Sequence, residues 1–323
     1  MAAAPFHAGE QALQQRAGNL ERLAEIGPRV VRAALPEQHQ TFFAQLPFVV
    51  VGSVDADGQP WASVLAGRPG FVQASSAERL RIAAHPWPQD PLAQHLRPGA
   101  PLGLLGIEPH TRRRNRANGQ VGAMDAAGFE LLVSQSFGNC PKYIQAREAR
   151  FVEQGGAAPQ PLARGDRLDA VARRLIQNAD TLFIASAHPA ARTPASAAEG
   201  VDVSHRGGRP GFVRIDADDT LTLPDFSGNG YFNTLGNLAL DARAGLLFID
   251  FEQGDMLQVA ASAEVVWDGF DAVAFAGAER LLRLRVSTVQ HWPRAMPLRW
   301  GASVLSPHLA SRDRPTGTAG MER

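Results

Sequence analysis

A six-residue identity within the chain constrains its fold more than any other feature of the sequence. The segment Gly67–Val72 (GRPGFV) recurs unchanged at Gly208–Val213, 141 residues further on. An apolar stretch precedes each copy, at Pro47–Val54 and at Thr181–Ala187, and each copy leads into a further apolar segment. Because self-similarity at a fixed offset indicates repeated structural units, the sequence predicts two tandem copies of one β-rich unit.

The apolar pattern around the repeat predicts short strands with few helices. Helical spacing at Leu13–Ala24 and a short helix at Pro36–Leu46 lead into a strand at Phe48–Val51, and Asp57-Gly58 is typical of a hairpin. Further elements are expected as strands at Leu102–Ile107, Gln120–Ala123 and Phe129–Ser134, helices at Pro141–Arg150 and Leu168–Ile176, strands at Thr181–Ala187, Val201–Ser204, Gly211–Ile215 and Leu221–Leu223, a helix at Phe232–Asp241, and strands at Leu246–Phe251 and Met256–Trp267. Short antiparallel strands that close as barrels are the predicted architecture, in a mainly β chain of the α+β class.

The length supports this organisation, because 323 residues at about 150 per domain suggest about two domains. The expected parts are an N-terminal helical segment (1–40), a first barrel copy (41–152), a Gly-, Pro- and Ala-rich linker (153–165), a second copy (166–300) and a C-terminal tail (301–323).

Charge and composition exclude several classes of function. The 32 basic and 32 acidic side chains balance, so no global field attracts nucleic acid or anionic lipid, and any anion site must be local. A single cysteine excludes an internal disulfide, and the nine histidines have no spacing typical of a metal site, so none is predicted. No apolar run approaches the length of a membrane helix, and we expect a cytoplasmic protein without membrane or nucleic-acid partners.

A glycine-rich corner in the second copy is the first candidate site. Ser204–Gly208 ends a strand, and Asp225–Gly230 leads into the helix that carries Asn233 and Thr234. Free N–H groups at a helix start, with a side chain such as Arg206, can bind a phosphate. The alternative is a hairpin turn followed by an ordinary N-cap.

Clustered arginines in the first copy are the second candidate. Arg112–Arg116 contains four arginines, followed by Asn118-Gly119. They could form a nucleic-acid patch, although no aromatic residues interleave for base stacking. The other interpretations are a solvated basic strand, or arginines that reach an anionic ligand or the acidic surface of the other copy.

The third candidate contains the only cysteine and the only lysine of the chain, within Ser134–Tyr143. At the predicted start of a helix, Asn139, Cys140 and Lys142 could line an anion or cofactor pocket. A thiolate there could be reactive, although no general base lies beside it in the sequence. Alternatively, Cys140 is a small buried residue and Lys142 is solvated.

Together these motifs resemble the FMN-binding split barrels of the pyridoxamine 5′-phosphate oxidase superfamily, over about Phe42–Trp300. The second copy carries the closer resemblance, at Asp202–Val213, Leu223–Asp225, Asn233–Leu238 and Ala244–Phe251. Arg112–Gly119 and Gly138–Tyr143 of the first copy are similar to tandem flavin-barrel proteins. The resemblance implies two tandem split β-barrels with peripheral helices.

The resemblance also implies an FMN at an interface between two barrels. Because the sequence predicts both barrels in one chain, we further hypothesise that this chain supplies both halves of the site. We expect cofactor contacts from Ser204, His205, Arg206, Leu223, Asp225, Asn229, Asn233, Thr234, Gly236, Asn237 and Arg299, with contributions from Arg112, Arg114, Arg116, Asn118, Gln135, Asn139, Cys140 and Lys142 of the first copy. No catalytic residue is assigned.

Two departures bear on the activity. The oxidase has a basic Arg-Lys pair where this chain has Asn233-Thr234, and its C-terminal Arg-x-His element has no counterpart in His291–Trp300. Pyridoxamine phosphate oxidation is therefore not expected. The sequence favours an FMN-dependent oxidoreductase that moves hydride or electrons between a nicotinamide or protein donor and a small acceptor, with a homodimer as one assembly open to it. The alternative is a non-catalytic flavin- or haem-binding carrier or sensor; haem and deazaflavin are the less favoured cofactors.

Overall fold

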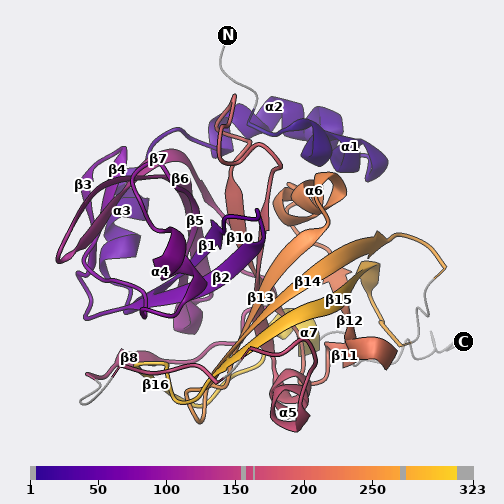
Figure 1. Ribbon diagram of the computed structural model, residues 1–323. Helices are drawn as coiled ribbons and strands as arrows, with labels where there is room; N and C mark the ends of the chain where they lie inside the picture. Colours follow the sequence, from indigo (N-terminus) through magenta and orange to yellow (C-terminus); the bar gives the residue numbers. More distant parts are fainter. Residues whose placement is uncertain (1–4, 154–157, 163, 270–273, 311–323) are drawn as a thin grey trace, which may run out of the picture.

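The computed structural model describes residues 5–153, 158–162, 164–269 and 274–310. Its core consists of two seven-stranded antiparallel sheets that lie side by side (Figure 1). The first has the strand order β2-β1-β5-β6-β7-β4-β3 and the second has the order β10-β9-β13-β14-β15-β12-β11. Adding eight to each strand number of the first sheet gives the second, so both sheets have one topology. The prediction of a mainly β chain with two tandem split barrels is confirmed.

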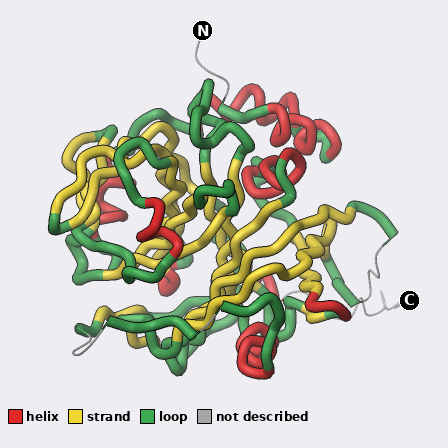
Figure 2. Tube along the Cα trace, viewed as in Figure 1, coloured by secondary structure: helices red, strands yellow, loops and turns green. Residues whose placement is uncertain are grey.

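The strands of the first sheet are β1 (Phe48–Val54), β2 (Pro60–Ala66), β3 (Val72–Ser76), β4 (Arg79–Ile82), β5 (Pro101–Glu108), β6 (Arg113–Asp125) and β7 (Gly128–Gly138). Those of the second sheet are β9 (Thr181–Ala187), β10 (Val201–Gly207), β11 (Arg214–Ile215), β12 (Thr220–Phe226), β13 (Arg243–Ile249), β14 (Met256–Val266) and β15 (Ala278–Trp292). A short ribbon pairs β8 (Ala149–Phe151) with β16 (Leu298–Trp300). The α-helices are α1 (Ala8–Arg16), α2 (Leu20–Val30), α3 (Glu37–Ala44), α4 (Pro91–His95), α5 (Ala170–Asn178), α6 (Asn233–Leu240) and α7 (Pro307–Ala310), and they lie around the sheets (Figure 2).

The repeated hexapeptide forms the same tight turn in both barrels. It connects β2 to β3 in the first barrel and β10 to β11 in the second. In each copy the phenylalanine N–H donates to the arginine carbonyl at 2.9 Å, and the glycine before the phenylalanine has φ +97° at Gly70 and +87° at Gly211. Proline followed by a glycine with positive φ is typical of a type II turn, which accounts for the proline and glycine that the two copies share.

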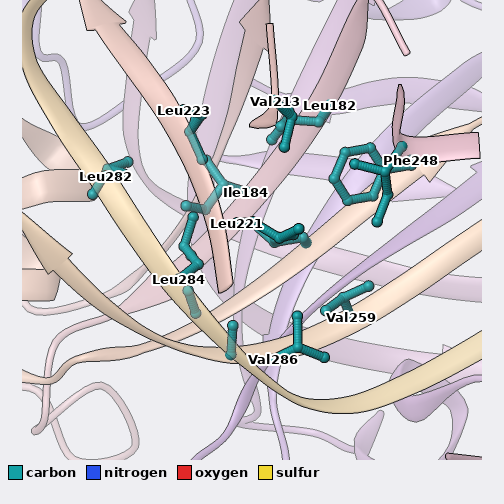
Figure 3. Close-up of a cluster of buried hydrophobic side chains, with 14 of the residues drawn as sticks. Leu182, Ile184, Val213, Leu221, Leu223, Phe248, Val259, Leu282, Leu284 and Val286 are labelled. Atoms are coloured by element: carbon teal, nitrogen blue, oxygen red, sulfur yellow. The ribbon is translucent and has the colours of Figure 1, made fainter. Parts of the chain in front are cut away.

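Each barrel encloses its own apolar core, and a third core joins the two. In the second barrel, leucines and valines from β9, β12, β14 and β15 point toward one another with Phe248 (Figure 3). The joining core packs β1, β2 and β5 of the first sheet against β9, β10 and β13 of the second, with Phe48, Val50, Phe183 and Val203 all buried. The barrels therefore form one packed unit.

Helices α1 and α2 lie outside both barrels, and α1 packs on α6 (Figure 1). Helix α1 approaches α6 through two glycines, because a Cβ at Gly9 would collide with the carbonyl oxygen of Gly236, and one at Gly236 would collide with Glu10. The helical spacing over Leu13–Ala24 is divided between α1 and α2, which are separated where Gly18 has φ +70°.

One predicted element is wrong. The helix expected over Pro141–Arg150 does not form; the backbone at Tyr143 is left-handed (φ +66°) and Ala149–Phe151 is a strand. Contacts with the second copy replace the helical hydrogen bonds, since Gln145 donates to the carbonyl of Gly208 at 3.0 Å and Arg147 pairs with Asp180. Cys140 and Lys142 therefore do not lie at a helix start.

Several other predicted elements coincide with observed ones, and one long strand was missed. The helix at Phe232–Asp241 is α6, and the strand at Thr181–Ala187 is β9. The fifteen-residue strand β15 was not predicted. Of the predicted linker and tail, 154–157, 163 and 311–323 lie outside the described residues.

Candidate functional site

A polar cavity of about 350 Å³ lies between the two barrels. Its walls come from β6 and the segment after β7 in the first barrel, and from β10, β12, β15 and the start of α6 in the second; α2 contributes at its edge. The predicted residues that line it are Ser204, His205, Arg206, Asp225, Asn229, Asn233 and Thr234 of the second copy, and Arg114, Arg116, Asn139, Cys140 and Lys142 of the first. One chain thus supplies both sides of the cavity.

The cavity has an excess of positive charge. Among the described residues that line it, six are Arg or Lys and two, Asp225 and Glu279, are acidic. The neutral net charge of the chain therefore conceals a local cationic site. The low-dielectric protein around such a cavity strengthens the attraction of its cationic groups for an anion.

Arg116 is the most deeply held cation of the cavity. It is 2% exposed, and its Nη1 donates to Asp202 Oδ1 and to Asn233 Oδ1, both at 3.0 Å. Its Nη2 donates to Ser204 Oγ at 2.5 Å, and Thr234 Oγ1 lies 2.9 Å from the same hydroxyl. Arg116 therefore belongs to the first sheet but is bonded to the second, which is one of the interpretations left open for the arginine cluster.

Two further arginines share one acid. Arg206 Nη1 donates to Asp225 Oδ1 at 2.5 Å, and Arg280 Nε lies 2.9 Å from Asp225 Oδ2. The guanidinium of Arg280 also packs on the rings of Phe232 and Trp267, 4.8 and 4.9 Å from their centroids. The sequence did not indicate Arg280, because it lies within the missed strand β15.

Arg114 contacts carbonyl oxygens. Its Nε donates to Cys140 O at 2.8 Å and its Nη1 to His205 O at 3.1 Å. Burial, followed by repulsion from Arg116 and Arg206, lowers the pKa of Arg114 to about 9. The guanidinium remains charged at neutral pH, in an environment that favours an added anion.

The start of α6 and a neutral histidine complete the cavity wall. Phe232, at the N-cap of α6, has a left-handed backbone (φ +63°) and makes no side-chain cap hydrogen bond within the described chain. The first N–H groups of a helix are free to bind an anion under these conditions. Burial, together with Arg114 and Arg206, holds the pKa of His205 well below its usual range, so its ring is neutral.

The other predicted residues lie outside this cavity lining. Leu223 is in the core of the second barrel, Gly236 contacts α1, and Arg299 is on the β16 ribbon. The remaining four act as structural donors: Asn118 to Asp202, Asn237 to Ser186 and Asp202, Gln135 to Pro5 O, and Arg112 to the carbonyls of Ile144, Val304 and Leu305.

The equivalent position on the other side of the barrel pair holds a different cavity, of about 250 Å³. In the strand register, Arg116 lies opposite Leu105 in the first sheet, and Gln258 lies opposite Leu247 in the second. Arg116 and Gln258 are therefore at equivalent positions of the two barrels. Gln258 donates to Ser63 Oγ at 3.2 Å, and Trp292 donates to Gln258 Oε1 at 2.8 Å. The registers also match Arg114 with Met256, His205 with Val64, Arg206 with Leu65 and Ser204 with Ser63.

The two cavities therefore have the same position in the pseudo-symmetric pair but opposite character. Val64, Leu65, Met256 and Met296 line the second cavity together with His85 and Glu153, and the described residues around it include no Arg or Lys. Trp292, fully buried, fills part of this region. Only the first cavity has the charges expected of an anion site.

The described residues also limit other classes of site. No helix among them is long and apolar enough to span a membrane. They contain no cluster of three or more His, Cys, Asp or Glu side chains suited to a metal ion.

Comparison with known proteins agrees with the class that the fold defines, a protein of two split barrels. Residues 35–155 match the family model described as pyridoxamine 5′-phosphate oxidase. The resemblance seen in the sequence is confirmed, and the family model matches about the first barrel of the chain. The match falls on the first barrel, although the sequence motifs suggest that the second is closer. No curated protein matches the chain.

Solved structures match about two fifths of the chain. HupZ from Group A Streptococcus is 15% identical, with 38% of this chain and 90% of that chain covered and a TM-score of 0.29. A FAD-binding protein from Mesorhizobium loti is 10% identical, with 41% and 99% covered and a TM-score of 0.26. HutZ, the haem storage protein from Vibrio cholerae, is 11% identical, with 44% and 99% covered and a TM-score of 0.25.

Proposed function

We propose that the chain binds one FMN in the cationic cavity between its barrels and acts as an oxidoreductase. The observation that carries this proposal is the concentration of basic side chains from both barrels around one cavity, where six Arg or Lys face two acids among the described lining residues. Buried cations are costly unless they are paired, and the phosphate of a flavin nucleotide is a suitable partner.

The residues present fit such a phosphate. Among the described residues, the buried donors Arg116 Nε, Asn139 Nδ2 and Arg206 Nε have no acceptor in the chain. These donors line the cavity together with Ser204, Thr234 and the free N–H groups of α6. Because buried donors are rarely left without an acceptor, this arrangement supports an anionic ligand.

Each side chain has a distinct part in holding the cofactor. Arg116 and Arg206, with Ser204 and Thr234, would bind the phosphate, while neutral His205 offers a ring without adding charge. Bound FMN would supply the redox chemistry, accepting and passing on hydride or electrons, while the protein orients it and limits access of water. The absence of Arg and Lys among the described residues that line the equivalent cavity supports one FMN per chain rather than two.

The test is the absorption spectrum of the purified protein, with extraction and mass identification of any cofactor. We expect a flavin spectrum and, after reconstitution, one FMN per chain. A protein that remains colourless and takes up no added FMN contradicts the proposal, and two equivalent FMN per chain contradict the single site. Reduction of bound flavin by a nicotinamide supports the enzyme; stable flavin without reduction by any donor favours a carrier.

A further inference from the structure

The side-chain amide of Asn233 lies between the carboxyl group of Glu10 and the guanidinium of Arg116. Its NH₂ group and its oxygen therefore have different partners, which fixes the orientation of the amide. Its Nδ2 donates to Glu10 Oε1 at 2.5 Å, and its Oδ1 accepts from Arg116 Nη1 at 3.0 Å. Turning the amide over would place NH₂ against a guanidinium and oxygen against a carboxylate. Glu10, from a helix outside both barrels, thus determines which way Asn233 faces.

Glu10 is itself held in one position. It is 2% exposed, and its Oε2 accepts from the backbone N–H of His7 at 2.7 Å in the capping box that starts α1. Helices α1 and α6 are in close contact where Gly9 meets Gly236. The carboxylate therefore reaches Asn233 with little freedom of position.

We propose that Glu10 is a positioning residue of the anion cavity: through Asn233 it holds the guanidinium of Arg116 where the cofactor phosphate binds. The inference rests on the proposed function. With Asn233 turned away, Arg116 Nη1 keeps Asp202 as its only bonded partner among the described residues. The N-terminal helix is then a third component of the site, in addition to the two barrels.

Loss of the charge of Glu10 and loss of its positioning of Asn233 have opposite expected effects on phosphate binding. Removing the negative charge of Glu10 makes the cavity more positive, which on its own strengthens binding of a phosphate. Losing the orientation of Asn233 weakens it. The burial of Glu10 and the nearby carboxylate of Asp202 both raise the pKa of Glu10, so measurements must be made at one fixed pH.

The experiment compares Glu10→Ala with Glu10→Gln, using FMN and riboflavin as probes. The two probes share the ring system but only FMN carries a phosphate, so the ratio of their dissociation constants isolates phosphate recognition. The glutamine variant keeps an oxygen that can accept from Asn233, whereas the alanine variant does not. We expect Glu10→Ala to lower the preference for FMN about tenfold, and Glu10→Gln to keep it within about threefold of the natural chain.

Gln14→Ala is the matched control, because Gln14 is also buried on α1 but donates to Tyr231 O rather than to Asn233. The Gln14→Ala variant should leave the ratio of the two dissociation constants unchanged. If Glu10→Ala weakens FMN and riboflavin binding equally, the effect is a general loosening of α1, and the inference is overturned. An unchanged or increased ratio in Glu10→Ala overturns it too. If the natural chain binds neither probe, or does not prefer FMN, the proposed function fails instead.

Discussion

Arg116 and Asp202 form a buried ion pair that joins the two barrels, with Nη1 3.0 Å from Oδ1. Asp202 also accepts from Asn118 at 2.7 Å. Two side chains of the first sheet therefore converge on one carboxylate of the second, directly behind the cavity. The pair stabilises the barrel interface and fixes one wall of the site at the same time.

Replacing Asp202 by Asn should destabilise the fold strongly. The change leaves the buried guanidinium of Arg116 without its charged partner, and removing one member of a buried pair typically costs about 3–5 kcal/mol. Chemical denaturation gives the free energy of unfolding. Glu25→Ala is the control, since the Glu25–Arg29 pair is exposed and should change stability by less than about 1 kcal/mol. Equal effects of the two variants would contradict the assignment.

Replacing Arg206 by Gln, or Thr234 by Val, should weaken FMN binding. Each variant removes a donor that we propose binds the phosphate, and we expect about a tenfold loss of affinity for Arg206→Gln, with a smaller loss for Thr234→Val. Flavin fluorescence titration measures the dissociation constants. Arg285→Gln, on an exposed position of β15, is the charge-matched control. Affinities equal to that of the natural chain would remove these residues from the phosphate site.

Replacing Trp292 by Phe should reduce stability without changing flavin content. The variant loses the indole hydrogen bond to Gln258, and an unpaired buried amide costs about 1–3 kcal/mol. Because the proposed FMN site is the first cavity, the amount of FMN bound per chain should stay the same. The free energy of unfolding and the flavin content are measured on one sample; loss of flavin in a folded variant would show that this cavity also holds cofactor.

The buried carboxyl of Asp90 should make stability fall with rising pH. Burial raises its pKa from 3.8 to about 6, so the folded chain retains a proton that the unfolded chain releases. The resulting contribution is complete below pH ~4, decreases as pH rises toward about 6, and amounts to about 3 kcal/mol at most. Comparison of the natural chain with Asp90→Asn from pH 4 to 7 isolates this carboxyl. A constant difference between the two across that range would contradict the raised pKa.

The sequence predicted the parts of the fold that depend on residues close together in the chain. Proline and glycine in the repeated hexapeptide favour a type II turn, which both copies form, and the polar start of α6 followed from the residues near Asn233. The helix at Pro141–Arg150 failed because contacts of Gln145 and Arg147 with the second barrel outweigh local helical preference.

The sequence predicted many residues of the candidate site but not the hydrogen bonds that connect them. Sequence motifs drew attention to Arg116 and Asn233, which lie 117 positions apart and meet in the cavity. Glu10 is 223 positions from Asn233, and its sequence context is that of an ordinary first turn of a helix. Its position depends on how α1 packs on α6, which no local pattern encodes.

Arg116 and Gln258 occupy equivalent positions of the two barrels but are different residues, and this difference is possible because both barrels belong to one chain. In a pair of identical subunits every substitution occurs on both sides of the axis, so a residue that suits one pocket is imposed on the other. Joining the halves in one polypeptide removes that restriction. One pocket can keep its arginines while its counterpart becomes apolar and takes in Trp292, so the chain can specialise one half for ligand chemistry and the other for mechanical support.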